Sequence, residues 1–373
     1  MLKGILIGIP FFILIFENSE CFISSYRKHF TMKRRQFLPV AIIFILALLL
    51  FFFYKPVTEY KVIHGKTQGT TYSISYEDRP GRNLQPRIDQ LLHKFDMSLS
   101  TYDPKSIISR INRNEKHVRL DRFFKKVFQK SEEVYHLSNG AFDITVAPLV
   151  NAWGFGHGKR VDVDSAYINS LLQFVGMDKV SIKNGTVVKE NPSVQLDVNA
   201  IAQGYSVDVV CDFLERKGIK NYLVEIGGEL KSKGVNKNGE LWKIGIDKPI
   251  DNNFSPGKDL QAVLRLNNKA LATSGNYRAF YEKNGVKYAH SINPKTGYPV
   301  MNRLLSATVM ANDCITADAF ATAFMIMGLE KSIIFISNQD SMDVYFVYSD
   351  DEGHYKTFMT PHIKELLIRD DEK

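Results

Sequence analysis

The 373-residue sequence predicts an α+β fold, with one compact unit that follows an apolar N-terminal segment. Strand-like runs joined by Asn-Gly, the strongest short-range signal for a β-hairpin, occur three times. Helical patterns lie between these runs without the regular strand–helix alternation that a doubly wound parallel sheet requires. The apolar fraction of 45%, with 25 Phe and 17 Tyr, is sufficient for a large core and excludes a disordered chain.

The expected elements follow the N-terminal segment in chain order. The three hairpins are expected within residues 180–190, 233–247 and 278–292, each with Asn-Gly at its turn. Because no linker is evident after the N-terminal segment, residues 56–373 are expected to form one domain. Helical periodicity predicts five helices, at Leu84–Phe95, Asp121–Ser138, Ala166–Val175, Ile201–Lys217 and Thr316–Met327.

The N-terminal segment is typical of an uncleaved signal anchor. An apolar run from Phe37 to Tyr54 follows Lys33, Arg34 and Arg35, and its length is at the short end of the ~20 residues that span a bilayer. No small-residue cleavage site follows, and no Cys there can take a lipid. Because the cations stay in the cytoplasm, we expect residues 1–55 to anchor the domain on the outer side of the cytoplasmic membrane. Two readings of residues 1–31 stay open: they are part of this segment, or they are an over-long gene start before a second Met.

Charge and cysteine content narrow the functional classes. The net charge is +8, but residues 1–55 carry seven Lys/Arg and two acids, which leaves +3 for the remainder. Without a basic stripe of interleaved aromatics, nucleic acid is not an expected partner. Cys211 and Cys314 are expected to be two buried thiols, although a disulfide between them stays open.

The apolar stretch at residues 315–328 contains two polar side chains. Asp318 and Thr322 are four residues apart, which places them on one face of a helix, one turn from each other. Thr316 is the expected cap, so Asp318 would lie in the first turn, where the helix dipole favours negative charge. That explanation leaves Thr322 without a role. A carboxylate and a hydroxyl one turn apart are half of a site for a hard divalent cation such as Mg²⁺.

A second stretch, VQLDVNAIAQGYSVDVV at residues 194–210, predicts a strand that enters a helix through a tight polar turn. The free N–H groups of such a turn bind anions, and Gly204 permits close approach by a phosphate or another backbone. The alternative is that Asp197 caps an ordinary helix.

Other segments carry weaker signals. Tyr102 lies in a polar turn after the first helix, and Asp143 lies between Phe142 and Ile144. Buried aromatics beside polar turns either hold a planar ring system or pack in the core. His290 ends a hairpin strand, where an imidazole acts as a general base or simply packs. The Gly-bearing turns at residues 225–230 and 272–277 offer amides to a ligand but are individually unspecific.

In this order, the segments resemble the ApbE family of FAD:protein FMN transferases, over about Gly65 to Phe358. The resemblance implies a T-fold-related bilobal core of antiparallel hairpins and helices. It also implies a magnesium-dependent enzyme, with Mn²⁺ as the alternative ion. Such an enzyme transfers FMN from FAD to a Thr or Ser hydroxyl of a partner protein through a phosphoester bond and releases AMP.

The resemblance also assigns residues. It places the metal on Asp318, Thr322 and the carbonyl of Ala200, and it makes His290 the catalytic residue. The family often has Met at position 68 and a cation at position 203, and both are Gln here. The implied FAD-binding residues are Gln68, Tyr102, Ala141, Phe142, Asp143, Asp197, Gln203 and Ile292.

The acceptor implied by the resemblance is a subunit of a membrane redox pump or a similar electron-transfer protein. Since the usual lipid-attachment motif is missing, the helix at residues 37–54 is the expected tether. Two other functions stay open on sequence alone. One is an FAD pyrophosphatase that uses water and releases FMN and AMP. The other is a non-catalytic, membrane-tethered flavin-binding protein.

Overall fold

The computed structural model describes residues 39, 42–45, 59–156, 163–249, 259–276, 280–283 and 286–368. The chain divides into two units, Met1–Val57 and Thr58–Lys373. Most of the predicted anchor lies outside the described residues. Within the described ranges, no helix is long and apolar enough to cross a membrane.

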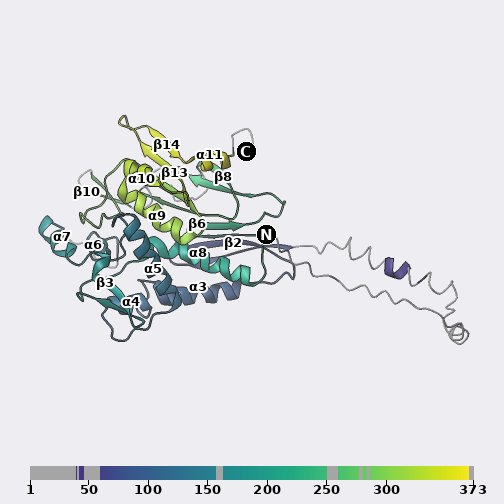
Figure 1. Cartoon of the computed structure of the whole chain (residues 1–373), viewed down its shortest axis with the longest axis horizontal. Coiled ribbons are helices and arrows are strands. Elements are labelled where there is room, and N and C mark those ends of the chain that lie inside the picture. The colour runs from purple at the N-terminus through teal and green to yellow at the C-terminus, as the bar shows by residue number, and fades with distance from the viewer. Residues whose placement is uncertain are drawn as a thin grey trace, which may run out of the picture. The chain divides into compact units, whose positions relative to one another are not determined.

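An eight-stranded antiparallel sheet is the centre of the second unit (Figure 1). Its order is β1-β2-β5-β6-β9-β12-β13-β14, so strands distant in sequence become neighbours at β6 and β9. These strands are β1 (Glu59–Thr67), β2 (Thr70–Asp78), β5 (Tyr222–Ile226), β6 (Glu229–Lys233), β9 (Ala270–Gly275), β12 (Leu304–Ala311), β13 (Asp343–Ser349) and β14 (Tyr355–Met359). Three two-stranded sheets accompany it, formed by β3 (Val180–Lys183) with β4 (Thr186–Lys189), β7 (Trp242–Asp247) with β8 (Leu260–Leu266), and β10 (Phe280–Lys283) with β11 (Val286–Ala289).

Two long helices, α8 (Asn199–Arg216) and α9 (Cys314–Met327), pack against each other and against the sheet. Both therefore have little exposed surface. The remaining helices are α3 (Gln85–Leu99), α4 (Ile107–Asn112), α5 (Arg122–Leu137), α6 (Ala147–Ala152), α7 (Ser165–Leu172), the 3₁₀ helix η1 (Met177–Lys179), α10 (Leu329–Ile336) and α11 (Pro361–Leu366).

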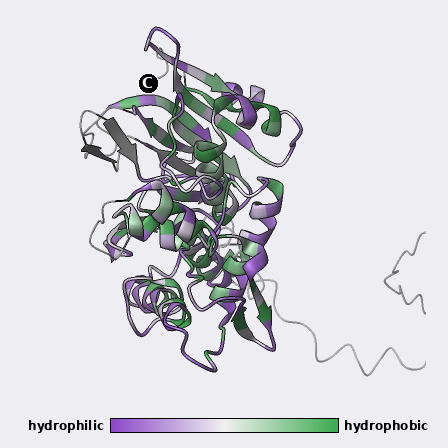
Figure 2. Cartoon of the chain, turned by 90° about the vertical axis from the view of Figure 1, so that its left-hand side faces the viewer, coloured by the Kyte–Doolittle hydropathy of each residue, from purple (hydrophilic) through white to green (hydrophobic). Residues whose placement is uncertain are grey.

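The central strands are buried on both faces. In β13, Val344 and Phe346 join the core on the α9 side, whereas Tyr345 and Val347 join a core with β7, β8 and α11. Alternate strand residues point to opposite faces, so both sets of side chains must be apolar. Figure 2 shows apolar (green) segments on strands and helices of the interior and polar (purple) segments at many of the outer loops.

The α+β prediction is confirmed, but one of the three predicted hairpins is wrong. β3 pairs with β4, and β10 pairs with β11, as expected. Within residues 233–247, by contrast, β6 pairs with β5 and β9, and β7 pairs with β8. The local turn does form, because Gly239 donates to the Asn236 carbonyl at 3.0 Å. This turn connects two sheets and does not connect two paired strands.

The five predicted helices correspond to α3, α5, α7, α8 and α9, with small differences at their ends. The predicted cap of α9 is wrong. The cap is Asp313, whose side chain accepts a hydrogen bond from the Thr316 backbone N–H at 3.0 Å. Thr316 therefore lies inside the helix, and Asp318 lies in its second turn. Cys211 and Cys314 are confirmed as buried free thiols.

Candidate functional site

A cavity of about 430 Å³ lies where α8 begins and α9 approaches its C-terminal half. The turn between β5 and β6, the end of β9, the segment before α6 and the chain after β11 complete its wall. Four of its lining residues are acids, and one is a histidine: Asp143, Asp197, Glu229, Asp318 and His290.

Asp318 is 5% exposed and lies on the cavity wall in the second turn of the apolar helix α9. Its Oδ2 accepts a hydrogen bond from the backbone N–H of Gly204 at 2.8 Å. A Cβ at Gly204 would lie 2.6 Å from the Asp318 Cβ and 2.4 Å from the Cys314 carbonyl oxygen. Glycine is thus required where α8 crosses α9, and the close backbone that the sequence left open as a reason for Gly204 is that of α9.

Burial raises the pKa of Asp318 to about 7, and the bond from Gly204 opposes this shift only in part. A buried carboxylate is costly when its lone pairs are not satisfied. In the described part of the chain, the Asp318 carboxylate accepts a hydrogen bond from the Gly204 N–H, through Oδ2. Its second oxygen therefore retains the capacity to bind a cation at the cavity.

Thr322 is one turn beyond Asp318 and also lines the cavity. Its Oγ1 is 3.1 Å from the Ser274 Oγ on β9. The neighbouring Thr273 bonds the Thr308 hydroxyl on β12 at 2.9 Å, which fixes β9 behind the site. A carboxylate and two hydroxyls thus converge on one side of the cavity.

The turn that leads into α8 forms the adjoining part of the cavity wall. The Asp197 backbone N–H donates to the Ile144 carbonyl at 2.7 Å, and the Asp197 Oδ1 accepts from the Asn199 N–H at 2.8 Å. Asp197 therefore serves the turn that precedes the helix, while Ala200 lies in the first turn of α8 on the cavity wall.

Asp143 also lines the cavity, but its own loop engages it. Its Oδ1 accepts from the Thr145 N–H at 2.8 Å and from the Thr145 hydroxyl at 2.6 Å. Burial raises the pKa of Asp143 to about 6, and the bonds from Thr145 oppose that shift. The adjacent Phe142 is 2% exposed and contributes an apolar surface to the wall.

His290 reaches the cavity from the chain after β11. Its ring lies edge-on to Phe155, with centroids 6.4 Å apart. Ile292 forms a β-bridge with Pro299 and is buried, so it fixes the segment that carries the histidine. A half-buried imidazole at a cavity wall can exchange a proton with a bound substrate.

Nine of the twelve sequence-predicted site residues line this cavity, and three do not. Gln68 lies behind α8, where its side-chain oxygen accepts from the Ser206 hydroxyl at 3.4 Å. Ala141 is buried beside the wall, and Tyr102 is 68% exposed. Thr101, next to Tyr102, lines a second cavity of about 290 Å³, which shares Asp197 with the first. The nine that line the main cavity are Phe142, Asp143, Asp197, Ala200, Gln203, His290, Ile292, Asp318 and Thr322.

Several lining residues were not singled out by their sequence. Gly227 and Glu229 belong to the turn between β5 and β6, and Ser274 and Gly275 belong to the end of β9. The available signal was the glycine-bearing turns at residues 225–230 and 272–277. Only the β6–β9 pairing brings these two turns to one cavity.

The residues at the α8–α9 crossing fit a hard divalent ion. The Asp318 carboxylate, the Thr322 and Ser274 hydroxyls and the backbone at Ala200 offer only oxygen atoms on the same wall. Mg²⁺ and Mn²⁺ prefer such ligands, whereas Zn²⁺ and Cu²⁺ favour nitrogen and sulfur.

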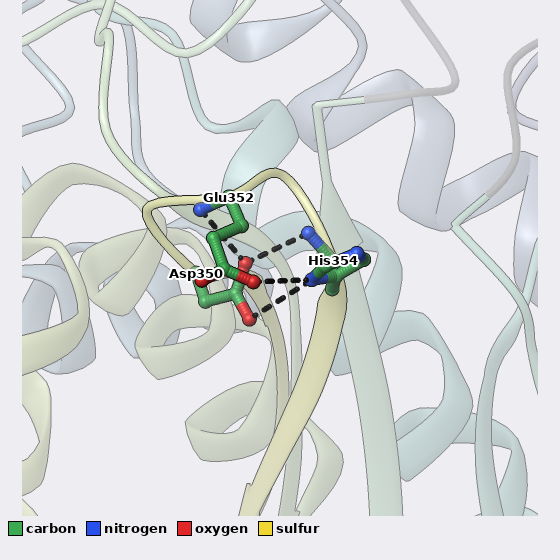
Figure 3. A group of neighbouring side chains, drawn as sticks. All are labelled: Asp350, Glu352 and His354. Atoms are coloured by element: carbon green, nitrogen blue, oxygen red, sulfur yellow. Dashed lines mark hydrogen bonds and ion pairs between the residues drawn. The ribbon is translucent and has the colours of Figure 1, made fainter.

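A different trio, Asp350, Glu352 and His354, gathers at the turn between β13 and β14 (Figure 3). The His354 ring nitrogen lies 3.6 Å from the Asp350 carboxylate and 3.2 Å from that of Glu352. Asp350 also pairs with Lys356 at 3.7 Å. Since Glu352 and His354 are exposed and these groups satisfy one another, the trio reads as an ordinary surface charge network.

The antiparallel sheet, the crossing of α8 and α9 and the oxygen-lined cavity define an α+β protein with a ligand-binding cavity suited to a divalent ion. The family model described as "ApbE family" matches residues 68–346. The chain belongs to the ApbE family, and the sequence-based assignment is confirmed.

The chain is similar to curated proteins named FAD:protein FMN transferase. That of Vibrio cholerae is 37% identical over 319 residues, which cover 82% of this chain and 92% of the relative. That of Haemophilus influenzae is 36% identical over 311 residues, covering 79% and 89%. The solved structure of the flavin transferase ApbE from V. cholerae matches with a TM-score of 0.74 and 37% identity, covering 83% of this chain and all of the other. The apo flavinyl transferase ApbE of Pseudomonas stutzeri matches with a TM-score of 0.73 and 31% identity, covering 83% and 97%.

Proposed function

We propose that this chain is a magnesium-dependent enzyme that transfers FMN from FAD to a Thr or Ser hydroxyl of a partner protein. The transfer forms a phosphoester bond and releases AMP. Family membership and similarity to proteins named FAD:protein FMN transferase, over 92% and 89% of the length of two of them, support the overall activity. The placement of Asp318 and Thr322 on the cavity wall is the observation that supports metal dependence.

The metal would be held by Asp318, Thr322 and the carbonyl of Ala200, with Ser274 close enough to Thr322 to orient its hydroxyl. When bound, Mg²⁺ supplies charge neutralisation for the pyrophosphate and for the departing AMP. The chain's own contribution is to hold the Asp318 carboxylate toward the cavity through the Gly204 N–H.

FAD is larger than one cavity of about 430 Å³, and the adjoining cavity that shares Asp197 extends the site. Phe142 and Ile292 provide buried apolar walls, and Gln203 provides an amide near the turn at Gly227. This mixture of apolar walls with a few polar groups is typical of cofactor-sized ligands.

His290 would act as the general base. In the transfer, the acceptor hydroxyl oxygen forms a bond to the FMN phosphorus, and the bond from that phosphorus to the AMP oxygen breaks. The hydroxyl proton moves to the imidazole, which must be neutral to accept it. The apolar edge contact with Phe155 orients the ring and reduces access by water.

The apolar N-terminal segment supports a proposal for the location of the enzyme. We propose that the apolar segment at residues 37–54 anchors the chain in the cytoplasmic membrane, with the catalytic unit on the extracytoplasmic side. The acceptor would then be an electron-transfer protein, such as a redox-pump subunit, exposed on the same side.

The experiment is an intact-mass measurement of an acceptor domain after incubation with the full-length protein in mild detergent, FAD and Mg²⁺. We expect the acceptor to gain the mass of one FMN less water, and this gain to disappear with EDTA. Free FMN and AMP beside an unmodified acceptor would instead indicate a pyrophosphatase. FAD that stays intact in the presence of Mg²⁺ would indicate a flavin-binding protein without catalysis.

A further inference from the structure

Asp208 is a buried carboxylate that lies outside the cavity and has no part in the reaction described above. It is 8% exposed, and burial raises its pKa. Its Oδ1 accepts from the Cys314 N–H at 3.0 Å and from the Lys231 Nζ at 3.1 Å, and its Oδ2 accepts from the Ile315 N–H at 2.9 Å. A side chain of α8 thus holds the first N–H groups of α9.

The start of α9 is consequently satisfied by two different acids. Asp208 accepts from the first two N–H groups of the helix, and Asp313 accepts from the third, that of Thr316. Asp313 lies in the same chain segment as α9 and bonds only locally. Asp208 instead comes from the neighbouring helix, so its hydrogen bonds fix one helix relative to the other.

These bonds belong to a series that runs along the crossing of the two helices. Asp208 meets Cys314, and one turn away Gly204 meets Asp318. Because the numbers rise on one helix as they fall on the other, the helices are antiparallel. The next turn of each helix carries Ala200 and Thr322, and both line the cavity. Asp208 and the metal-binding wall therefore lie at opposite ends of the packing contact between α8 and α9.

Lys231 links this contact to the sheet. It lies on β6, and its ammonium group donates to the same Oδ1 of Asp208 that accepts from the Cys314 N–H. β6 pairs with β9, the strand that carries Ser274 beside Thr322. The Asp208 carboxylate on α8 is thus bonded to α9 and to β6, the strand that pairs with β9.

We propose that Asp208 is a positioning residue for the metal site, because it sets the register of α9 on α8 and so the placement of Asp318 and Thr322 opposite Ala200. The inference rests on the metal site of the proposed function. Groups that orient metal ligands without touching the ion alter metal affinity by about 10- to 100-fold when replaced.

The test measures Mn²⁺ binding to the full-length protein without FAD. The electron paramagnetic resonance signal of free Mn²⁺ reports how much of the ion remains unbound. Asp208→Asn keeps the length of the side chain but places an amide N–H₂ against a helix N–H or Lys231. Asp208→Glu keeps the charge but adds one methylene between α8 and α9. We expect both variants to raise the Kd for Mn²⁺ by about 10-fold or more.

Asp313→Asn is the matched control. It removes one negative charge from the same end of α9, but Asn caps helices as well as Asp does. We expect its Kd for Mn²⁺ to stay within about twofold of the wild-type value. Circular dichroism spectra and thermal unfolding identify any variant that does not fold, and either Asp208 variant alone then tests the proposal.

The outcomes separate the proposal from the function on which it rests. An Asp208→Glu variant that folds and binds Mn²⁺ like the wild type would show that the carboxylate does not act by position. If Asp313→Asn and Asp208→Asn lose Mn²⁺ affinity to the same extent, the loss is explained by the removed negative charge and not by the position of the Asp208 carboxylate. If the wild-type protein binds no Mn²⁺ that depends on Asp318, the metal site itself is wrong.

Discussion

Asp143 and Asp318 are both buried acids on the wall of one cavity, but they differ in what their carboxylates receive. Asp143 accepts two hydrogen bonds from Thr145, within its own turn. Asp318 accepts one, from the Gly204 N–H on a neighbouring helix. The pKa of each is raised by burial, to about 6 and about 7. Asp143 is bonded within its own turn, whereas Asp318 has the Thr322 and Ser274 hydroxyls beside it, which are further oxygen ligands for an ion.

The largest effect is expected when the second acid is replaced. Asp318→Ala should reduce Mg²⁺-dependent FMN transfer by about 10³-fold, because a bound metal contributes several kcal/mol to the stabilisation of developing charge. The fold should persist. The substitution removes a costly buried carboxylate, and the Gly204 N–H is the hydrogen-bond donor that then needs a new acceptor. Initial rates at saturating FAD measure this loss, and unchanged turnover would contradict the assignment.

Replacement of the proposed base should have the next largest effect. His290→Ala should lower the transfer rate by about 10²-fold or more, the usual contribution of a general base, while Mn²⁺ and FAD still bind. His354→Ala, at the exposed turn of Figure 3, is the control and should transfer FMN at the wild-type rate. A His290→Ala variant as fast as this control would exclude a proton-transfer role.

The loop acid should affect stability and its pH dependence more than chemistry. The folded pKa of Asp143, about 6, exceeds its ordinary value of 3.8, so the folded state holds a proton that the unfolded state has lost. The contribution of Asp143 to stability is therefore present below about pH 4 and is lost as the pH rises through 6.

Asp143→Asn keeps an oxygen acceptor for Thr145 and removes this titration. Between pH 4 and pH 7, the free energy of unfolding of the wild type should therefore fall by up to about 3 kcal/mol relative to that of the variant. Urea titrations at these two pH values measure the difference. An identical pH dependence in both proteins would show that the Asp143 carboxyl is not shifted.

The smallest effect is expected at Gln68, which lies behind α8. Gln68→Met loses only the long 3.4 Å bond from Ser206 and removes an amide nitrogen that is buried without a hydrogen-bond partner in the described part of the chain. Stability should change by no more than about 1 kcal/mol, and transfer by less than about threefold. A larger loss of transfer would mean that this side chain reaches FAD directly.

Local sequence signals predicted the helices well, and they predicted the pairing of strands less well. α8 and α9 follow from apolar periodicity, and Asp318 with Thr322 follows from a four-residue spacing. The Asn-Gly at residues 238–239 does make a turn, but hydrogen bonds with distant segments decide that β6 pairs with β9 and β7 with β8.

The same limit applies to the site. Ser274 could not be assigned from sequence, because its distance to Thr322 depends on the packing of β9 under α9. Thr316 was the expected cap of α9, but the cap is Asp313, whose side chain accepts from the N–H three residues further along the chain. Gln68, Tyr102 and Ala141 were assigned by resemblance to the family, and none of the three lines the cavity.

The most direct measurement compares the two acids in one titration. Full-length wild type, Asp318→Asn and Asp143→Asn are titrated with Mn²⁺, and bound metal is counted from the resonance of the free ion. We expect one bound ion, with the same Kd in the wild type and Asp143→Asn and with a Kd at least about 10² times higher in Asp318→Asn. The assignment of the metal to α9 would be contradicted if Asp318→Asn bound Mn²⁺ as tightly as the wild type. It would also be contradicted if Asp143→Asn alone lost Mn²⁺ affinity.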